Sequence, residues 1–72
     1  MNISEKEFCQ IINTNSGRLH HLCRVYAEHK EDEKDIFQEI VIQVWESLSS
    51  FNEEAQLSTW IYRIGLNTAI SF

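Results

Sequence analysis

The absence of proline and the scarcity of glycine constrain the fold of this chain most. Its 72 residues include no Pro, and Gly17 and Gly65 are the only glycines. Pro and Gly mark tight turns, and a β fold needs many of them. So few turn residues favour helices joined by short connections. We therefore predict one domain, residues 1–72, that folds as an all-α, compact three- to four-helix bundle. A domain of this size buries only ~60% of the surface that its unfolded chain exposes.

Hydrophobic spacing and capping residues predict four helical segments. The first begins near Ser4, which forms an S-x-x-E capping box with Glu7. A polar cluster at residues 13–17 predicts a break or kink, and a second helix then runs to about Tyr26. A third helix covers residues 32–49, and a fourth follows the polar residues 52–56. The side chains that we expect to be buried are Phe8, Leu22, Tyr26, Phe37, Val41, Val44, Leu48, Ile61 and Ile64.

Charge is distributed unevenly along the chain. Residues 28–54 hold nine acids and two bases, a net charge of −7, whereas residues 55–72 hold no acid and one base, Arg63. The net charge of −5 weighs against a general nucleic-acid binder, because affinity for phosphate comes mainly from Lys and Arg. The acidic middle and the polar, aromatic C-terminal third are therefore expected to serve different purposes.

Several classes of protein fit this sequence poorly. No apolar run approaches the ~20 residues of a membrane span, and acids stand where a signal peptide has a basic start. We therefore expect a cytoplasmic protein with no membrane partner. Cys9 and Cys23 suit that compartment as reduced thiols, although the sequence leaves a disulfide between them open.

Catalytic and metal-binding motifs are also lacking. There is no Gly-rich phosphate loop or nucleophile motif, and no carboxylate lies in an apolar setting that would raise its pKa. The residues His20, His21, Cys23 and His29 include nitrogen and sulfur ligands, but they have no second half at zinc-site spacing. We expect neither an enzyme nor a bound metal or other cofactor.

Three motifs in the second half of the chain occur in an informative order. A D-x-x-Q-E helix begins at Asp35, a loop led by Phe51 follows, and a T-W-x-Y-R-I-x-x-N helix runs from Thr59 to Asn67. In order and spacing the chain resembles region 2 of the extracytoplasmic-function (ECF) sigma factors of the sigma-70 family. The resemblance covers nearly the whole chain. It implies a transcription initiation domain that docks on RNA polymerase and recognises and melts the promoter −10 element.

The resemblance implies a polymerase-binding surface on the third predicted helix. In such factors the D-x-x-Q-E surface binds the clamp helices of the polymerase β′ subunit. The helical wheel independently places Ile42 among acidic residues, and carboxylates around an apolar centre suit a partner helix that bears Arg and Leu. The residues expected to bind polymerase are Asp35, Gln38, Glu39, Ile42 and Trp45.

The resemblance also implies a DNA-reading surface on the loop and the fourth predicted helix. Family members capture an unstacked base of the non-template strand near this loop and contact neighbouring bases from the helix. Asn can read base edges, Arg can hold phosphate, and aromatic rings can stack on bases. The residues expected to bind DNA are Phe51, Asn52, Thr59, Trp60, Tyr62, Arg63 and Asn67.

The sequence departs from the family pattern at three places. After Phe51 the loop reads Asn52-Glu53-Glu54, where relatives commonly have a basic residue and a Gly. Gly65 stands where a small helix former such as Ala is usual. The chain also ends before the basic residues, the linker and the C-terminal region 4 domain of the family, so we expect a fragment of a longer protein.

Two further partners or functions stay open at the level of sequence. An anti-sigma factor binds and masks this domain in many members of the family. The alternative function is a helical protein–protein interaction module that never contacts DNA, which the net charge of −5 favours. Against that alternative stands the T-W-x-Y-R-I-x-x-N stretch, which lies in a segment without acids from Ala55 onward.

Overall fold

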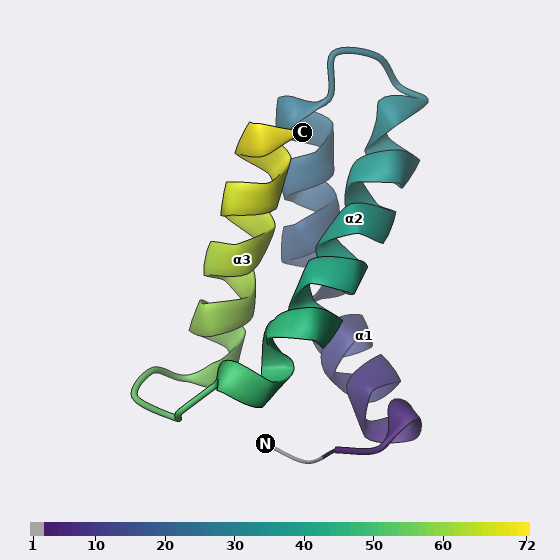
Figure 1. The fold of residues 1–72 in the computed structure, drawn as a ribbon. Helices are drawn as coiled ribbons and strands as arrows, with labels where there is room; N and C mark the ends of the chain where they lie inside the picture. Colours follow the sequence, from purple (N-terminus) through teal and green to yellow (C-terminus); the bar gives the residue numbers. More distant parts are fainter. Residues whose placement is uncertain (1–2) are drawn as a thin grey trace.

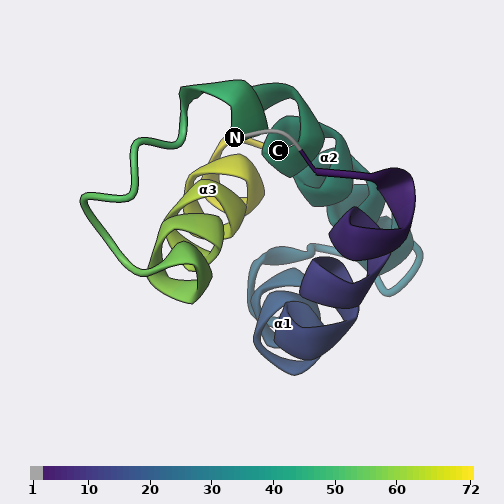
Figure 2. The ribbon, with the colours of Figure 1, turned by 90° about the horizontal axis from the view of Figure 1, so that it is seen from below.

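Three helices form the computed structural model, which describes residues 3–72 and contains no strand within that range (Figure 1). They are α1 (Glu5–Tyr26), α2 (Asp32–Ser47) and α3 (Leu57–Ser71), with a short 3₁₀ helix, η1 (Leu48–Ser50), after α2. Each helix packs against the other two, and the view along the bundle shows them around a common centre (Figure 2). The predicted all-α bundle is confirmed, with three helices where four segments were predicted.

The predicted break at residues 13–17 is wrong, because α1 runs through it without interruption. The polar side chains of this cluster bond back to the preceding turn of the same helix. Thr14 Oγ1 donates to the carbonyl of Gln10 at 2.9 Å, and Asn15 Nδ2 donates to the carbonyl of Ile11 at 2.8 Å. Thr and Asn side chains often disfavour helix because they bond to the backbone in other conformations, but here their hydrogen bonds are formed within the helix.

The start of α1 follows the predicted capping box. The backbone N–H of Glu7 donates to Ser4 Oγ at 3.1 Å, and the N–H of Ser4 donates to the Glu7 carboxylate at 3.2 Å. The reciprocal pair satisfies two of the N–H groups that every helix start leaves free. At the other end of the bundle, α2 begins at Asp32 as predicted. It ends at Ser47 rather than Ser49, because the chain tightens into η1.

The core confirms most of the side chains expected to be buried, including Val44 and Leu48, and adds Ile36 on α2. On α2 the buried residues are Ile36, Ile40 and Val44, whereas Phe37 and Val41 are only half-buried. Because α2 packs against both α1 and α3, its most buried line points between these two helices, and Phe37 and Val41 lie at its margin. Tyr26 was also expected inside but is 42% exposed, since it is the last residue of α1. The full set of buried hydrophobic residues is Phe8, Ile12, Leu19, Leu22, Cys23, Ile36, Ile40, Val44, Leu48, Phe51, Ile61 and Ala69.

A glycine sets the distance between α1 and α3. Gly65 is buried at their contact, while Ile64 and Thr68 beside it are half-buried. A Cβ added at Gly65 would lie 2.8 Å from Leu19 Cδ2 and 3.3 Å from Leu22 Cδ1. These distances are shorter than carbon–carbon van der Waals contact, so even Ala does not fit without movement. The departure at this position therefore allows closer packing of the two helices.

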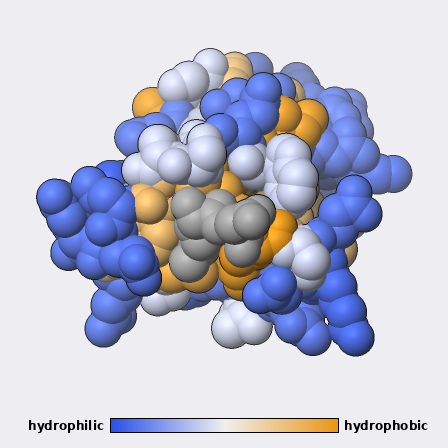
Figure 3. All heavy atoms as spheres, turned by 60° about the horizontal axis from the view of Figure 1, so that its bottom comes forward, coloured by the Kyte–Doolittle hydropathy of each residue, from blue (hydrophilic) through white to orange (hydrophobic). Residues whose placement is uncertain are grey.

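The structure also addresses two expectations from the sequence, which concern a membrane span and a disulfide. At the end of the bundle where α1 begins, hydrophobic atoms show between polar side chains (Figure 3). None of the helices within residues 3–72 has the length and apolarity that a bilayer crossing demands. Cys9 is exposed and Cys23 buried, and both are free. Fourteen positions apart on one helix, they are separated by ~21 Å, far beyond disulfide reach.

Val44 provides a direct test of the core. Val44 is fully buried, so we expect Val44→Ala to lower the free energy of unfolding by about 1–3 kcal/mol. Val25→Ala is the matched control, because Val25 is 57% exposed and should lose less than about 0.5 kcal/mol. Urea denaturation followed by circular dichroism measures both. Equal losses in the two variants would contradict the assigned core.

The two glycines test the close contact between α1 and α3. Nothing lies within 4 Å of a Cβ added at Gly17, so Gly17→Ala should raise the free energy of unfolding by about 1 kcal/mol through helix propensity. Gly65→Ala gains the same propensity but must displace Leu19, which has no exposed surface. Overpacking costs about 1–3 kcal/mol, so the net effect should be a loss of about 1 kcal/mol. Stabilisation of both variants in thermal melts would show that the helices are not in close contact there.

Candidate functional site

The outer face of α2 presents four of the five residues predicted to bind polymerase. Asp35 and Gln38 are exposed, and Ile42 and Trp45 are 50% and 46% exposed. Their spacing of three, four and three residues keeps them on one line of the helix surface. The ring of Trp45 is held by Phe8 of α1 in an edge-to-face contact with centroids 4.8 Å apart. One edge of this surface is therefore fixed by the bundle.

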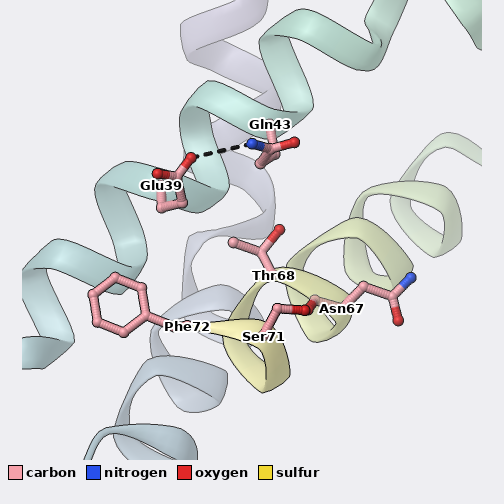
Figure 4. Close-up of a pocket in the computed structure, with 6 residues that line it drawn as sticks. All are labelled: Glu39, Gln43, Asn67, Thr68, Ser71 and Phe72. Atoms are coloured by element: carbon pink, nitrogen blue, oxygen red, sulfur yellow. Dashed lines mark hydrogen bonds between the residues drawn. The ribbon is translucent and has the colours of Figure 1, made fainter.

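Glu39, the fifth predicted polymerase contact, lies apart from this line. It is half-buried on the side of α2 that faces α3, and its Oε2 accepts a hydrogen bond from Gln43 Nε2 at 3.1 Å. Together these side chains form one wall of a groove of about 530 Å³, whose other wall comes from the last turns of α3 (Figure 4). The lining residues are Glu39, Gln43, Asn67, Thr68, Ser71 and Phe72. Thus one predicted polymerase contact and one predicted DNA contact, Asn67, share a single groove.

The loop before α3 differs from the sequence-based expectation for Phe51. This side chain is buried, with its ring 5.0 Å from that of Trp60, so it supports the loop from beneath. Asn52 is exposed, and its Oδ1 accepts a hydrogen bond from the N–H of Glu54 at 3.2 Å. Between them Glu53 has φ +65°, a left-handed conformation that favours Gly. A turn usually made with Gly is here made with Glu and stabilised by Asn52.

On α3 the predicted DNA contacts divide between two sides. Thr59, Arg63 and Asn67 are exposed and point away from the core. Trp60 is half-buried against Phe51. Tyr62 is also half-buried, on the side of α3 that faces α1. The structure therefore brings Thr59, Arg63 and Asn67 together as an open polar strip and gives Trp60 and Tyr62 supporting contacts.

A cationic side chain from α1, which the sequence analysis did not single out, joins this surface. The guanidinium carbon of Arg18 lies 4.4 Å from the ring centroid of Tyr62. Gly17, Arg18, His21 and Tyr62 line a hollow of about 420 Å³ between the two helices. The sequence signal that could have found it is the stretch from Phe8 to Ala27, which contains no acid.

Charge is separated by helix. Apart from Glu5 and Glu7 at the start of α1, every acid lies in α2 or in the two connections that flank it. The rest of α1 and all of α3 are free of acids, and these two helices pack together. One side of the bundle is therefore acidic, and the other carries Arg18 and Arg63 without any neighbouring carboxylate in its helices.

The groups considered for metal binding are dispersed. Within residues 3–72 no three His, Cys, Asp or Glu side chains gather where they could hold a metal ion. The His20 ring stacks on Phe37 at 4.1 Å, nearly parallel. Burial raises the pKa of the Cys23 thiol, and the charge of Glu33 raises it further, so this thiol stays protonated at neutral pH. Neither side chain has the environment of a metal ligand or a nucleophile.

Comparisons with known proteins show which family this chain belongs to. The family model described as Sigma-70 region 2 matches residues 11–72. The ECF RNA polymerase sigma factor SigW of Bacillus subtilis is 30% identical over 63 residues, 88% of this chain and 34% of that protein. The ECF RNA polymerase sigma-E factor of Haemophilus influenzae is 31% identical over 68 residues, 94% of this chain and 35% of that protein. The RNA polymerase sigma factor NccH of Alcaligenes xylosoxydans is 30% identical over 60 residues, 83% of this chain and 32% of that protein.

These matches cover most of this chain but only part of each relative. The chain spans about a third of the length of the curated relatives that it matches. No solved structure matches it significantly. The helical fold, the motif order and the match over residues 11–72 are consistent with one another, and they show that the chain belongs to the sigma-70 region 2 family, as a domain of the ECF sigma-factor type.

Proposed function

We propose that this domain binds the clamp helices of the RNA polymerase β′ subunit through α2 and reads the opened non-template strand of the promoter −10 element through α3. Membership of the sigma-70 region 2 family gives the general role in transcription initiation. The observation that carries the finer proposal is the separation of charge by helix, because α2 and its flanking connections hold nearly all the acids, whereas α3 holds none.

The outer face of α2 is suited to another helix. Ile42 and Trp45 offer exposed apolar area, and Asp35 and Gln38 flank them with polar groups. At such interfaces the apolar residues supply buried area, while complementary charges set orientation and register. A basic, Leu-containing helix pair of the polymerase clamp has the matching chemistry.

The polar strip of α3 is suited to a strand whose bases are unstacked. Asn67 can donate to and accept from a base edge, and Arg63 can hold phosphate or guanine. Trp60 rests on Phe51, so its ring is positioned before any base arrives. Because residues 55–72 contain one base and no acid, this strip neutralises few phosphates, and duplex affinity should be small. Specificity then depends on contacts to bases.

The competing function is a helical adaptor that binds only protein. The exposed Ile42 and Trp45 would serve an adaptor equally well. An adaptor, however, has no need for an acid-free side that presents Arg63, Asn67 and half-buried aromatic rings. Strand binding by the polymerase-bound domain is therefore the property that separates the two functions.

The docking proposal is tested on α2. We expect Asp35→Ala and Gln38→Ala each to weaken binding to a β′ clamp-helix fragment by about 1–3 kcal/mol, as measured by calorimetry. Glu39→Ala should weaken it less, because this side chain is half-buried towards α3. Glu28→Ala is the control, since it removes the same charge from the α1–α2 connection. Circular dichroism should show little change in any variant, because none of these residues is buried. Full binding by the triple variant would exclude this docking surface.

The strand-reading proposal is tested on α3. The probe is a single strand containing the −10 element, obtained by selection from a random pool with the polymerase complex. Asn67→Ala and Arg63→Ala should each lose about 1–3 kcal/mol of binding to it, measured by fluorescence anisotropy. Asn13→Ala, an exposed Asn on α1, should have no effect.

Two further measurements complete this test. Binding to the β′ fragment should survive the α3 substitutions, because Arg63 and Asn67 are not on the outer face of α2. The isolated chain should bind duplex DNA barely at all, with a shallow salt dependence. Tight duplex binding, or unchanged strand binding by both α3 variants in the polymerase complex, would rule out this reading surface.

A further inference from the structure

The α1–α3 side of the bundle carries a cationic site that the proposed function has not used. It consists of Arg18 and His21 from α1 and Tyr62 from α3, around the hollow of about 420 Å³. None of these residues belongs to the outer face of α2 or to the groove between α2 and α3. Arg63 follows Tyr62 directly and is exposed, about 100° further round α3 from the hollow.

The contact of Arg18 with Tyr62 does not use the hydrogen-bonding capacity of the guanidinium. Its guanidinium carbon lies 4.4 Å from the centroid of the Tyr62 ring, and the side chain is exposed. A guanidinium carries five N–H donors in a planar fork, and a contact with an aromatic ring leaves donors available for an anion. That fork matches two oxygens of one phosphate. Contact with the ring also restricts the side chain, which reduces the entropy lost when an anion binds.

The surroundings favour an anion over a cation. From Phe8 to Ala27 and from Ala55 to Phe72 the chain has no Asp or Glu, and these segments pack side by side as α1 and α3. Gly17 leaves open space beside Arg18, since nothing lies within 4 Å of a Cβ added there. Neither of these two acid-free segments carries a carboxylate that would repel a phosphate or compete with it for Arg18, and the hollow has room for one.

We propose that Arg18, held over Tyr62 and assisted by His21, binds a backbone phosphate of the single strand whose bases α3 reads. The site takes a phosphodiester of any sequence, so it contributes affinity and position rather than base preference. It rests on the proposed function only for the identity of the strand. Arg18 and Arg63 then flank one strand from two helices, which explains how a chain with a net charge of −5 can retain DNA.

Matched arginine variants test this site. Arg18→Ala should weaken binding of a fluorescein-labelled single strand of mixed sequence roughly tenfold in fluorescence anisotropy. Arg24→Ala removes the same charge from the same helix but lies outside the hollow, and it should change binding less than about twofold at physiological salt, where exposed charges are screened beyond ~8 Å. Loss of one phosphate contact should make the slope of log K against log salt shallower by about 0.7. Each variant is measured as the free chain and bound to core polymerase, after circular dichroism has shown an unchanged fold.

A strand with a neutral methylphosphonate backbone identifies the group that Arg18 contacts. Wild type and Arg18→Ala should bind this strand equally, whereas Asn67→Ala should still differ from wild type. Equal losses in Arg18→Ala and Arg24→Ala, or an Arg18 effect that persists on the neutral strand, would overturn the phosphate site. Weakened binding to core polymerase in Arg18→Ala, with strand binding unchanged, would reassign Arg18 to a protein contact.

The same experiment separates this inference from the proposed function. If the chain binds mixed strands through Arg18 but shows neither polymerase binding nor preference for a −10 strand, the proposed function fails and the phosphate site stands. If polymerase docking and the Asn67 effect are present without any Arg18 effect, the proposed function stands and the phosphate site fails. Absence of strand binding by wild type, free and on polymerase, would end both the phosphate site and the DNA half of the proposed function.

Discussion

The contact of Gly65 with Leu19 and Leu22 is the constraint on which the arrangement of the bundle depends. A Cβ at this position would come within 2.8 Å of Leu19, so the approach of α3 to α1 requires the missing side chain. That approach closes the core over Ile40 and Ile61, which have no exposed surface. It also places Tyr62, three residues before the glycine, beneath Arg18. Core packing and the composition of the α1–α3 surface therefore share one cause: Gly65 forgoes about 1 kcal/mol of helix propensity relative to Ala and permits close contact.

The fold class and the helix starts could be predicted from the sequence because they depend on local chemistry. The scarcity of Pro and Gly favours helices, and the capping box at Ser4 and the hydrophobic spacing predict where helices begin. The all-α fold and the starts of α1 and α2 are confirmed. The break expected at residues 13–17 failed because turn propensity is a weak preference that Asn15 and Thr14 overcome by bonding to α1 itself. The core of α2 was predicted correctly at Val44 and Leu48 but not at Phe37, which is half-buried. A helical wheel assumes one partner, whereas α2 has two, so Ile36 is buried as well.

The sequence could predict the part of the candidate site that lies on one helix, but not the contacts between helices. The spacing of Asp35, Gln38, Ile42 and Trp45 identifies one face of α2, and the structure exposes that face. No pattern within a single helix shows that Glu39 turns towards Asn67, that Phe51 supports Trp60, or that Arg18 rests on Tyr62. Each of these depends on how two helices, or a loop and a helix, meet. Even so, the acid-free stretch of α1 was visible in the sequence, and reading it together with the acid-free α3 would have indicated a shared surface.

The separation of charge gives the two surfaces complementary effects under the proposed function. Phosphates near α2 would meet the acids of residues 28–54, and exposed charges act over ~8 Å at physiological salt, about the distance between packed helices. Under this proposal a strand is thereby kept from the outer face of α2 and directed to the side of the bundle where Arg18 and Arg63 lie. Clamp helices rich in Arg would experience the opposite preference. The acids that lower the net charge to −5 thus need not oppose DNA binding, because they restrict it to one orientation. If the same charged residues were spread evenly, no surface would attract a DNA strand or fix its orientation. The position of each charge therefore matters more here than the net charge.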